Sequence, residues 1–154
     1  MTDLQPGAHV AAQGDTAAVI MAGSGEAVTY RLLDERSKRV AQLFHAAGLR
    51  PGDHIGVMME NHPRYFEVFW GAQRAGLYTT PISWHLKADE AGYIIEDCGA
   101  TALVVSAALH DVAADLSGYL DNVTVKLMID GTIDGYDSYE AEIAKFPAEP
   151  LDDE

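Results

Sequence analysis

The chain has 154 residues, of which 24 are Asp or Glu, 10 are Lys or Arg and 48% are hydrophobic. This length is enough for one domain with a real core, or for part of a larger domain. The formal net charge of -14 disfavours sequence-independent binding to nucleic acid, which needs basic side chains to displace counterions. It equally disfavours adsorption to an anionic membrane surface.

Cysteine content and apolar patterning indicate a cytoplasmic protein. A single cysteine cannot form an internal disulfide. No apolar run approaches membrane-spanning length, and the first basic residue is Arg31, so no secretory leader is recognisable. We therefore expect a cytoplasmic chain with no nucleic-acid partner and no membrane span.

Composition divides the chain into three parts. Residues 1–16 are predicted to be an N-terminal extension, residues 17–146 an α/β unit and residues 147–154 an acidic linker. Residues 101–154 hold 12 acidic and 2 basic residues, a net charge of -10, and the linker contains two prolines. Such a segment buries too little apolar surface to offset the cost of ordering. A chain that stops in a linker is expected to be a piece of a longer protein.

The first elements form a predicted hairpin. Apolar runs over residues 17–21 and 27–29 flank Gly23-Ser24-Gly25, whose glycines supply turn conformations closed to other residues. A phosphate-binding loop is the alternative. It is disfavoured because no helix start follows directly and the lysine of the P-loop pattern is missing.

The next segment reads as a helix from Thr29, a suitable N-cap, to about Ala47, with Gly48 as its stop. Its apolar residues share one face, and charged residues such as Asp34 lie mostly off it. The continuous apolar run 55–59 fits a strand covered on both faces.

A second helix is predicted to begin with Pro63 at its first position and to end at Gly76. The residues that mark one face of this helix are Phe66, Phe69, Trp70 and Gln73. The elements predicted after it are a strand over 78–82, a helix over 89–98, a strand over 102–105, a helix over 108–116, a strand over 125–129 and a helical turn or two over 138–146.

Strands that alternate with helices imply right-handed crossovers and a mostly parallel sheet with helices on both faces. The predicted fold class is α/β. Ligands of such sheets usually bind at the carboxyl ends of the strands. Here these ends are residues 60–61, 81–85, Ser106 and 130–131.

No catalytic or metal site can be assembled from the residues. The six histidines, at positions 9, 45, 54, 62, 85 and 110, show no metal-binding spacing. Cys98 lies on a predicted apolar helix face and is interpreted as a buried small hydrophobe. Residues 130–135 resemble the start of a calcium loop, but Ala141 stands where that loop needs a glutamate.

The order of the motifs is more informative than any one of them. In chain order they are Val28-Thr29-Tyr30, Leu33-Asp34-Glu35-Arg36-Ser37, Gly48-Leu49-Arg50-Pro51-Gly52-Asp53, Glu60-Asn61-His62-Pro63, Ala75-Gly76-Leu77-Tyr78-Thr79-Thr80-Pro81-Ile82 and Tyr93-Ile94-Ile95-Glu96-Asp97-Cys98-Gly99-Ala100. This series resembles the N-terminal part of the adenylate-forming (AMP-binding) superfamily, nearest to acyl-CoA synthetases such as the fatty-acid–CoA ligases. The resemblance covers about residues 15–145.

The resemblance implies an incomplete N-terminal subdomain of the adenylate-forming fold. It also implies a parent enzyme that joins a carboxylic acid, most simply a fatty acid, to AMP and passes the acyl group to coenzyme A. Such a parent uses ATP, Mg and coenzyme A. The phosphate loop and the catalytic lysine of the family lie downstream of the matched region, so no catalytic residue is expected in this chain, which should be inactive alone.

One family feature falls inside the chain. Residues 81–86 match a stretch written Pro-x-Asn-x-Arg-Leu, whose arginine approaches the coenzyme A nucleotide in some coenzyme A ligases. His85 takes the place of that arginine and Ser83 the place of the asparagine. His85 is therefore the candidate coenzyme A contact, weaker and pH-dependent because histidine is largely neutral near pH 7. A solvated loop residue is the alternative. Lys87 stands where the family usually has a helix-capping threonine.

Two other functions stay open. One is an adenylating enzyme of another branch, loading a carrier protein or acting like a luciferase. The other is an α/β module that binds a partner through an acidic face and does no chemistry. Apolar faces and strand edges that the rest of a parent would cover predict that the isolated chain self-associates.

Overall fold

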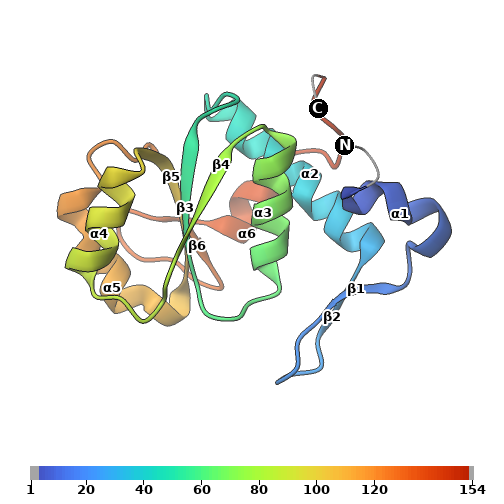
Figure 1. Ribbon diagram of the computed structural model, residues 1–154, viewed down its shortest axis with the longest axis horizontal. Helices are drawn as coiled ribbons and strands as arrows, with labels where there is room; N and C mark the ends of the chain where they lie inside the picture. The colour runs from blue at the N-terminus through green and yellow to red at the C-terminus, as the bar shows by residue number, and fades with distance from the viewer. Residues whose placement is uncertain (1–3, 153–154) are drawn as a thin grey trace.

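The computed structural model describes residues 4–152 and contains a five-stranded parallel sheet with helices on both faces (Figure 1). The strand order is β4-β3-β5-β6-β7. The strands are β3 (His54–Met58), β4 (Tyr78–Ile82), β5 (Ala100–Ser106), β6 (Val125–Ile129) and β7 (Asp137–Ser138). The predicted fold class is confirmed, and every pairing in this sheet is parallel.

A two-stranded antiparallel sheet lies outside the main sheet. Its strands are β1 (Ala17–Ile20) and β2 (Ala27–Thr29), which form the predicted hairpin. Figure 1 shows this hairpin projecting from the start of α2, away from the five strands. The helices are α1 (Pro6–Gln13), α2 (Tyr30–Ala46), α3 (Arg64–Arg74), α4 (Ala88–Asp97), α5 (His110–Asp115) and α6 (Tyr139–Ile143).

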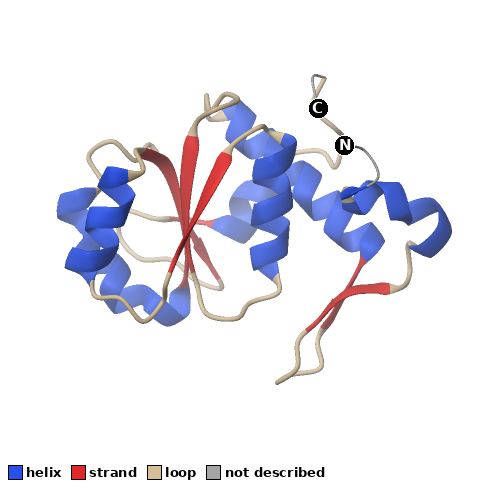
Figure 2. Ribbon diagram, viewed as in Figure 1, coloured by secondary structure: helices blue, strands red, loops and turns tan. Residues whose placement is uncertain are grey.

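The main sheet separates two apolar cores. Figure 2 shows helices on both faces of this sheet. On one face α2, α3 and α6 pack against the sheet, and the buried side chains include Phe44 and Val104. On the other face α4 and α5 pack against it, and the buried side chains include Ile95 and Leu103. Because Val104 and Leu103 are neighbours on β5, adjacent positions of one strand serve opposite cores. This is why the central strands are apolar throughout and lack alternation.

The start of α2 and the ends of α2 and α3 lie where the sequence predicts them. The Thr29 side chain accepts a hydrogen bond from the Leu32 N–H (3.2 Å) and caps α2. Gly48 and Gly76 follow α2 and α3 with φ of 94° and 69°, a left-handed conformation that glycine adopts without steric cost. Both predicted stops are confirmed.

Four local expectations differ from the structure. Helix α1 lies in the segment predicted to be only an extension. It has no side-chain cap and is held by packing, with Pro6 buried and the His9 ring 5.2 Å from the Tyr30 ring. Helix α3 begins one residue later than expected, at Arg64. The helix predicted over 108–116 is α5 between two 3₁₀ turns, and β7 had no predicted counterpart.

The buried face of α3 was also predicted wrongly. Phe66 is 40% exposed and Gln73 is exposed, whereas Val68, Gly71 and Ala72 are buried. These small residues let α3 approach α2 closely, and the aromatic residues lie at the margin of the contact. Size of side chain, rather than hydrophobicity alone, selects the face.

The close approach of α2 and α3 yields a stability prediction. A Cβ added at Gly71 would lie 2.4 Å from Val40 Cγ1 and 3.1 Å from the Ser37 carbonyl oxygen. We expect Gly71→Ala to lower the free energy of unfolding by about 1–3 kcal/mol through overpacking, despite the better helix propensity of alanine. Urea unfolding measures the change.

The matched control is Gly118→Ala, because a Cβ there meets no heavy atom within 4 Å. This variant should change the free energy of unfolding by less than about 0.5 kcal/mol. Equal stability of the two variants would show that the helices do not meet at Gly71.

Candidate functional site

The carboxyl ends of β3, β5 and β6 carry the polar residues that the sequence placed at this edge of the sheet. Ser106, at the end of β5, is 1% exposed, and its hydroxyl donates to Glu60 Oε2 in the loop after β3. The same hydroxyl oxygen accepts from the Ala108 N–H at 3.2 Å. Glu60 is thereby tied to the neighbouring strand.

His62 joins the turn after β3 to the turn after β6. Its Nε2 lies 2.9 Å from Asp130 Oδ2, and its Nδ1 accepts from the Arg64 N–H at 3.2 Å, at the start of α3. The neutral tautomer with hydrogen on Nε2 satisfies both contacts. Asp130 has φ of 61°, unusual for a non-glycine residue, and its N–H donates to Glu140 Oε1 at 3.1 Å.

Arg64 contacts three carboxylates near this edge of the sheet. Its guanidinium lies 3.2 Å from Glu140 Oε1, 3.3 Å from Glu67 Oε2 and 3.9 Å from Asp130 Oδ1. Burial lowers the pKa of Arg64, but the charges of Glu67 and Glu140 outweigh burial and the net pKa is raised. The guanidinium is therefore a permanent cation held among anions.

Glu67 lies behind Arg64 and is fully buried, at 0% exposure. Its Oε1 accepts from Arg36 Nη1 at 2.7 Å, and its Oε2 accepts from the Tyr139 hydroxyl at 3.2 Å. Burial, followed by the nearby Glu67 charge, raises the pKa of Tyr139 well above its ordinary value. Tyr139 is thus kept neutral as a hydrogen-bond donor.

A second buried ion pair joins α2 and α3. Arg74 Nη2 lies 2.6 Å from Asp34 Oδ1, and Arg74 Nε donates to the Ser37 hydroxyl at 3.0 Å. Lys38 Nζ contacts the other oxygen of Asp34 at 2.8 Å. Asp34, expected off the packed face of its helix, is 6% exposed. Arg74 offsets the cost of burying it.

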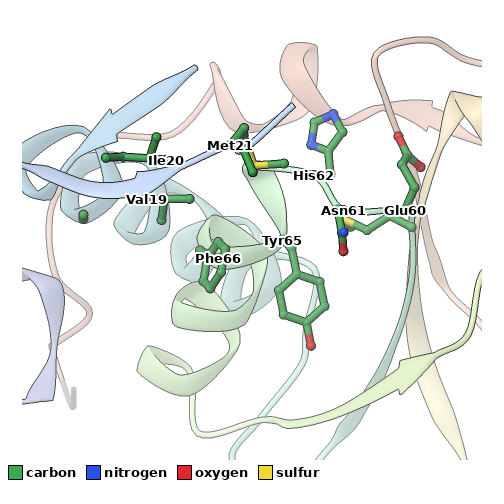
Figure 3. A pocket seen from close by; sticks show the side chains of 11 residues that line it. Val19, Ile20, Met21, Glu60, Asn61, His62, Tyr65 and Phe66 are labelled. Carbon is green, nitrogen blue, oxygen red and sulfur yellow. The ribbon is translucent and has the colours of Figure 1, made fainter. Parts of the chain in front are cut away.

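A cleft of about 650 Å³ lies between the β1–β2 hairpin and the start of α3 (Figure 3). Figure 3 shows Val19 of the hairpin facing Phe66 of α3, with the loop after β3 closing one end. The lining residues are Ala18, Val19, Ile20, Met21, Ala22, Met59, Glu60, Asn61, His62, Tyr65 and Phe66. Its walls are mainly apolar, and its polar groups come from the strand-end loop.

His85 lies elsewhere, in the loop after β4. It is exposed, its ring centroid is 3.8 Å from that of Trp84, and its N–H donates to the Ser83 hydroxyl at 3.4 Å. It lines neither the cleft nor the His62–Asp130 contact. Nearby, Glu90 accepts from the Lys87 N–H at 3.0 Å and supplies part of the cap that lysine cannot.

Within residues 4–152, no three His, Cys, Asp or Glu side chains gather as a metal site requires. The carboxylates at the strand ends are already engaged, Glu60 by Ser106 and Asp130 by His62. As they stand, these two engaged carboxylates do not fit a magnesium ion, and no chemical step is assigned to them. Cys98 is partly buried against the α4–α5 core, in line with its interpretation as a small hydrophobe. No helix of the described chain is long and apolar enough to cross a membrane.

The sequence missed the buried charges. Glu67 and Asp34 each have one partner on their own helix, Arg64 and Lys38. Their other partners lie 31 and 72 positions away for Glu67 and 40 positions away for Asp34, so no local motif reveals them. The available signal was a charged residue inside a helix between apolar neighbours, which is Glu67 between Phe66 and Val68.

The fold defines a class of protein. It is an α/β protein with a parallel sheet, and such sheets usually bind ligands at the carboxyl ends of their strands. The sequence profile of the family described as AMP-binding enzyme matches residues 7–153. The chain belongs to the AMP-binding enzyme family.

Two curated relatives are similar over much of the chain. Long-chain fatty acid transport protein 1 of Bos taurus is 33% identical over 119 residues, which is 77% of this chain and 18% of the relative. Fatty acid–[acyl-carrier-protein] ligase ScoC of Streptomyces coeruleorubidus is 33% identical over 95 residues, which is 62% of this chain and 18% of the relative. The chain thus spans about a fifth of the length of the curated relatives it matches.

Solved structures share the fold. The anthranilate CoA ligase AuaEII in complex with anthranoyl-AMP superposes with a TM-score of 0.84 at 21% identity, covering 94% of this chain and 27% of that one. The fatty acyl CoA synthetase of Mycobacterium tuberculosis has a TM-score of 0.80 at 20% identity, covering 97% of this chain and 29% of that one. The predicted resemblance to the N-terminal part of acyl-CoA synthetases is confirmed.

Proposed function

We propose that the chain is the N-terminal part of an AMP-forming acid–CoA ligase. The parent activates a carboxylic acid, most simply a fatty acid, with ATP and passes the acyl group to coenzyme A. The observation that carries the proposal is the family match over residues 7–153. Two similar proteins named for fatty acids and one named a CoA ligase support the finer substrate assignment. The cytoplasm is the proposed location.

In this proposal residues 17–146 form the α/β subdomain and supply a scaffold, and the reacting groups lie elsewhere in the parent. The contacts at the strand ends support this role. Glu60, Asp130 and Glu140 are each held by a partner from another element. Groups engaged in this way position loops and are poorly available to a substrate.

The first prediction concerns catalysis. The 154-residue chain should show no acid-dependent exchange of pyrophosphate into ATP, because in this proposal the reacting groups lie elsewhere in the parent. The measurement is radiolabelled pyrophosphate exchange with a panel of fatty and aromatic acids. The fatty acyl CoA synthetase of Mycobacterium tuberculosis is the reference enzyme. Exchange by the short chain would overturn the scaffold role.

The second prediction concerns His85, the proposed coenzyme A contact. Trp84 and His85 together offer an exposed ring pair beside the end of β4, suited to a nucleotide base and its phosphate. His85→Arg should tighten binding of 3′,5′-ADP, the nucleotide part of coenzyme A, by about three- to tenfold, because arginine is permanently charged and binds phosphate in a bidentate manner. His85→Ala should weaken binding. NMR shift titrations of the 154-residue chain measure both.

The matched control is His110→Arg, which adds the same charge at another exposed histidine. An equal gain in both arginine variants would mean that added charge alone attracts the nucleotide and would contradict a site at His85. An unchanged affinity in His85→Ala would do the same.

A second candidate function is loading of a carrier protein. It is favoured by the similarity to ScoC, which is named a fatty acid–[acyl-carrier-protein] ligase. Omission of coenzyme A from an assay of the parent separates the two. Product formed only with coenzyme A supports the CoA ligase, and product formed only with carrier protein supports the alternative.

A further inference from the structure

His62 makes a pair of contacts that only its neutral form allows. Its Nδ1 accepts a hydrogen bond from the Arg64 N–H at 3.2 Å, and its Nε2 donates to Asp130 Oδ2 at 2.9 Å. An imidazolium carries hydrogen on both ring nitrogens and has no acceptor. It keeps the contact with Asp130, but it cannot accept from the Arg64 N–H. The side chain is 12% exposed, so a proton from water can reach the ring.

The bond from the Arg64 N–H matters because it lies at the start of α3. The first N–H groups of a helix have no partner inside the helix. Within the described chain, Pro63 at the N-cap position makes no side-chain cap. The His62 ring takes the place of that cap. It does so with the spacing of an Asx turn, in which a side chain accepts from the N–H two residues further on.

Charges of both signs surround His62. Asp130, on the turn after β6, is an anion that favours the imidazolium, and Glu140 of α6 accepts from the Asp130 N–H. The Arg64 guanidinium, 3.9 Å from Asp130 Oδ1, and the positive end of the α3 dipole act in the opposite sense. Glu60, on the same loop as His62, is hydrogen bonded to the end of β5. Protonation therefore strengthens the contact with Asp130 and removes the contact with the Arg64 N–H.

We propose that His62 is a pH-sensitive cap of α3. The neutral ring caps the helix, and the protonated ring holds Asp130 and releases the Arg64 N–H to water. The change takes place between about pH 5 and 8, where histidine side chains usually change charge. His62 lines one end of the cleft together with Glu60 and Asn61 (Figure 3), so the release also changes the shape of that end.

NMR of the isotope-labelled 154-residue chain tests the proposal from about pH 5 to about pH 8. At the upper limit the His62 ring should be the tautomer with hydrogen on Nε2. As the ring becomes protonated, the Arg64 amide signal should move with the same midpoint as the ring signals. The protection of this amide against solvent exchange, relative to an unstructured chain at the same pH, should fall by about tenfold, the factor expected for the loss of one hydrogen bond.

His62→Asn is the matched variant, because the asparagine side-chain oxygen accepts from the same N–H throughout this pH range. Its Arg64 amide should not respond to pH. His110 is the control within the wild-type chain. Its Nδ1 lies 3.1 Å from the Ala107 carbonyl oxygen and its Nε2 3.1 Å from Asp111 Oδ1, so protonation breaks neither contact. The amides next to His110 should keep their protection.

Four results would overturn the proposal: a neutral His62 ring with hydrogen on Nδ1, a ring that stays neutral down to about pH 5, an Arg64 amide that does not respond while the ring titrates, or an equal response in His62→Asn. The first three are read from the wild-type chain and do not require the variant to fold. None of these measurements depends on the proposed ligase activity.

Discussion

The buried carboxylate of Glu67 is the interaction on which the rest of this molecule depends. It receives an ion pair from Arg36 of α2, another from Arg64 of its own helix and a hydrogen bond from Tyr139 of α6. All three helices on one face of the sheet are thus joined by one side chain. A buried carboxylate is tolerated only when its oxygens are satisfied in this way.

Arg64 links the buried Glu67 to the turns at the carboxyl ends of the strands. Its guanidinium contacts Glu67 inside and Glu140 and Asp130 outside, and Asp130 in turn meets His62. The turns after β3 and β6 are therefore fixed relative to the core by a continuous chain of charged contacts. In a parallel α/β fold these are the turns that usually border a ligand.

Much of the architecture could be predicted from the sequence because the relevant signals are local. The run over residues 55–59, the cap at Thr29 and the stops at Gly48 and Gly76 each act within a few positions. Family resemblance supplied the rest of the fold class. Helix α1 was missed because it has no cap and is stabilised by contacts with α2.

The candidate site was less predictable, because its contacts join residues that lie far apart in the sequence. Glu67 and Tyr139 are 72 positions apart, and His62 and Asp130 are 68 apart, so no local pattern relates them. The buried face of α3 differs from the prediction because Gly71, whose missing side chain allows the close helix contact, carries no hydrophobic signal in the sequence. The strand-end positions themselves, Glu60 and Ser106, were predicted correctly, since topology alone places them at one edge.

The most direct measurement is the free energy of unfolding of Glu67→Gln beside that of Glu142→Gln. Glu142 pairs with Lys145 on the surface at 2.6 Å, with the lysine 61% exposed. Removal of the buried charge should cost about 3–5 kcal/mol, because Arg36 loses its ion pair and Arg64 loses its buried one. Removal of the surface charge should cost less than about 1 kcal/mol. Equal losses in the two variants would contradict the central place of Glu67.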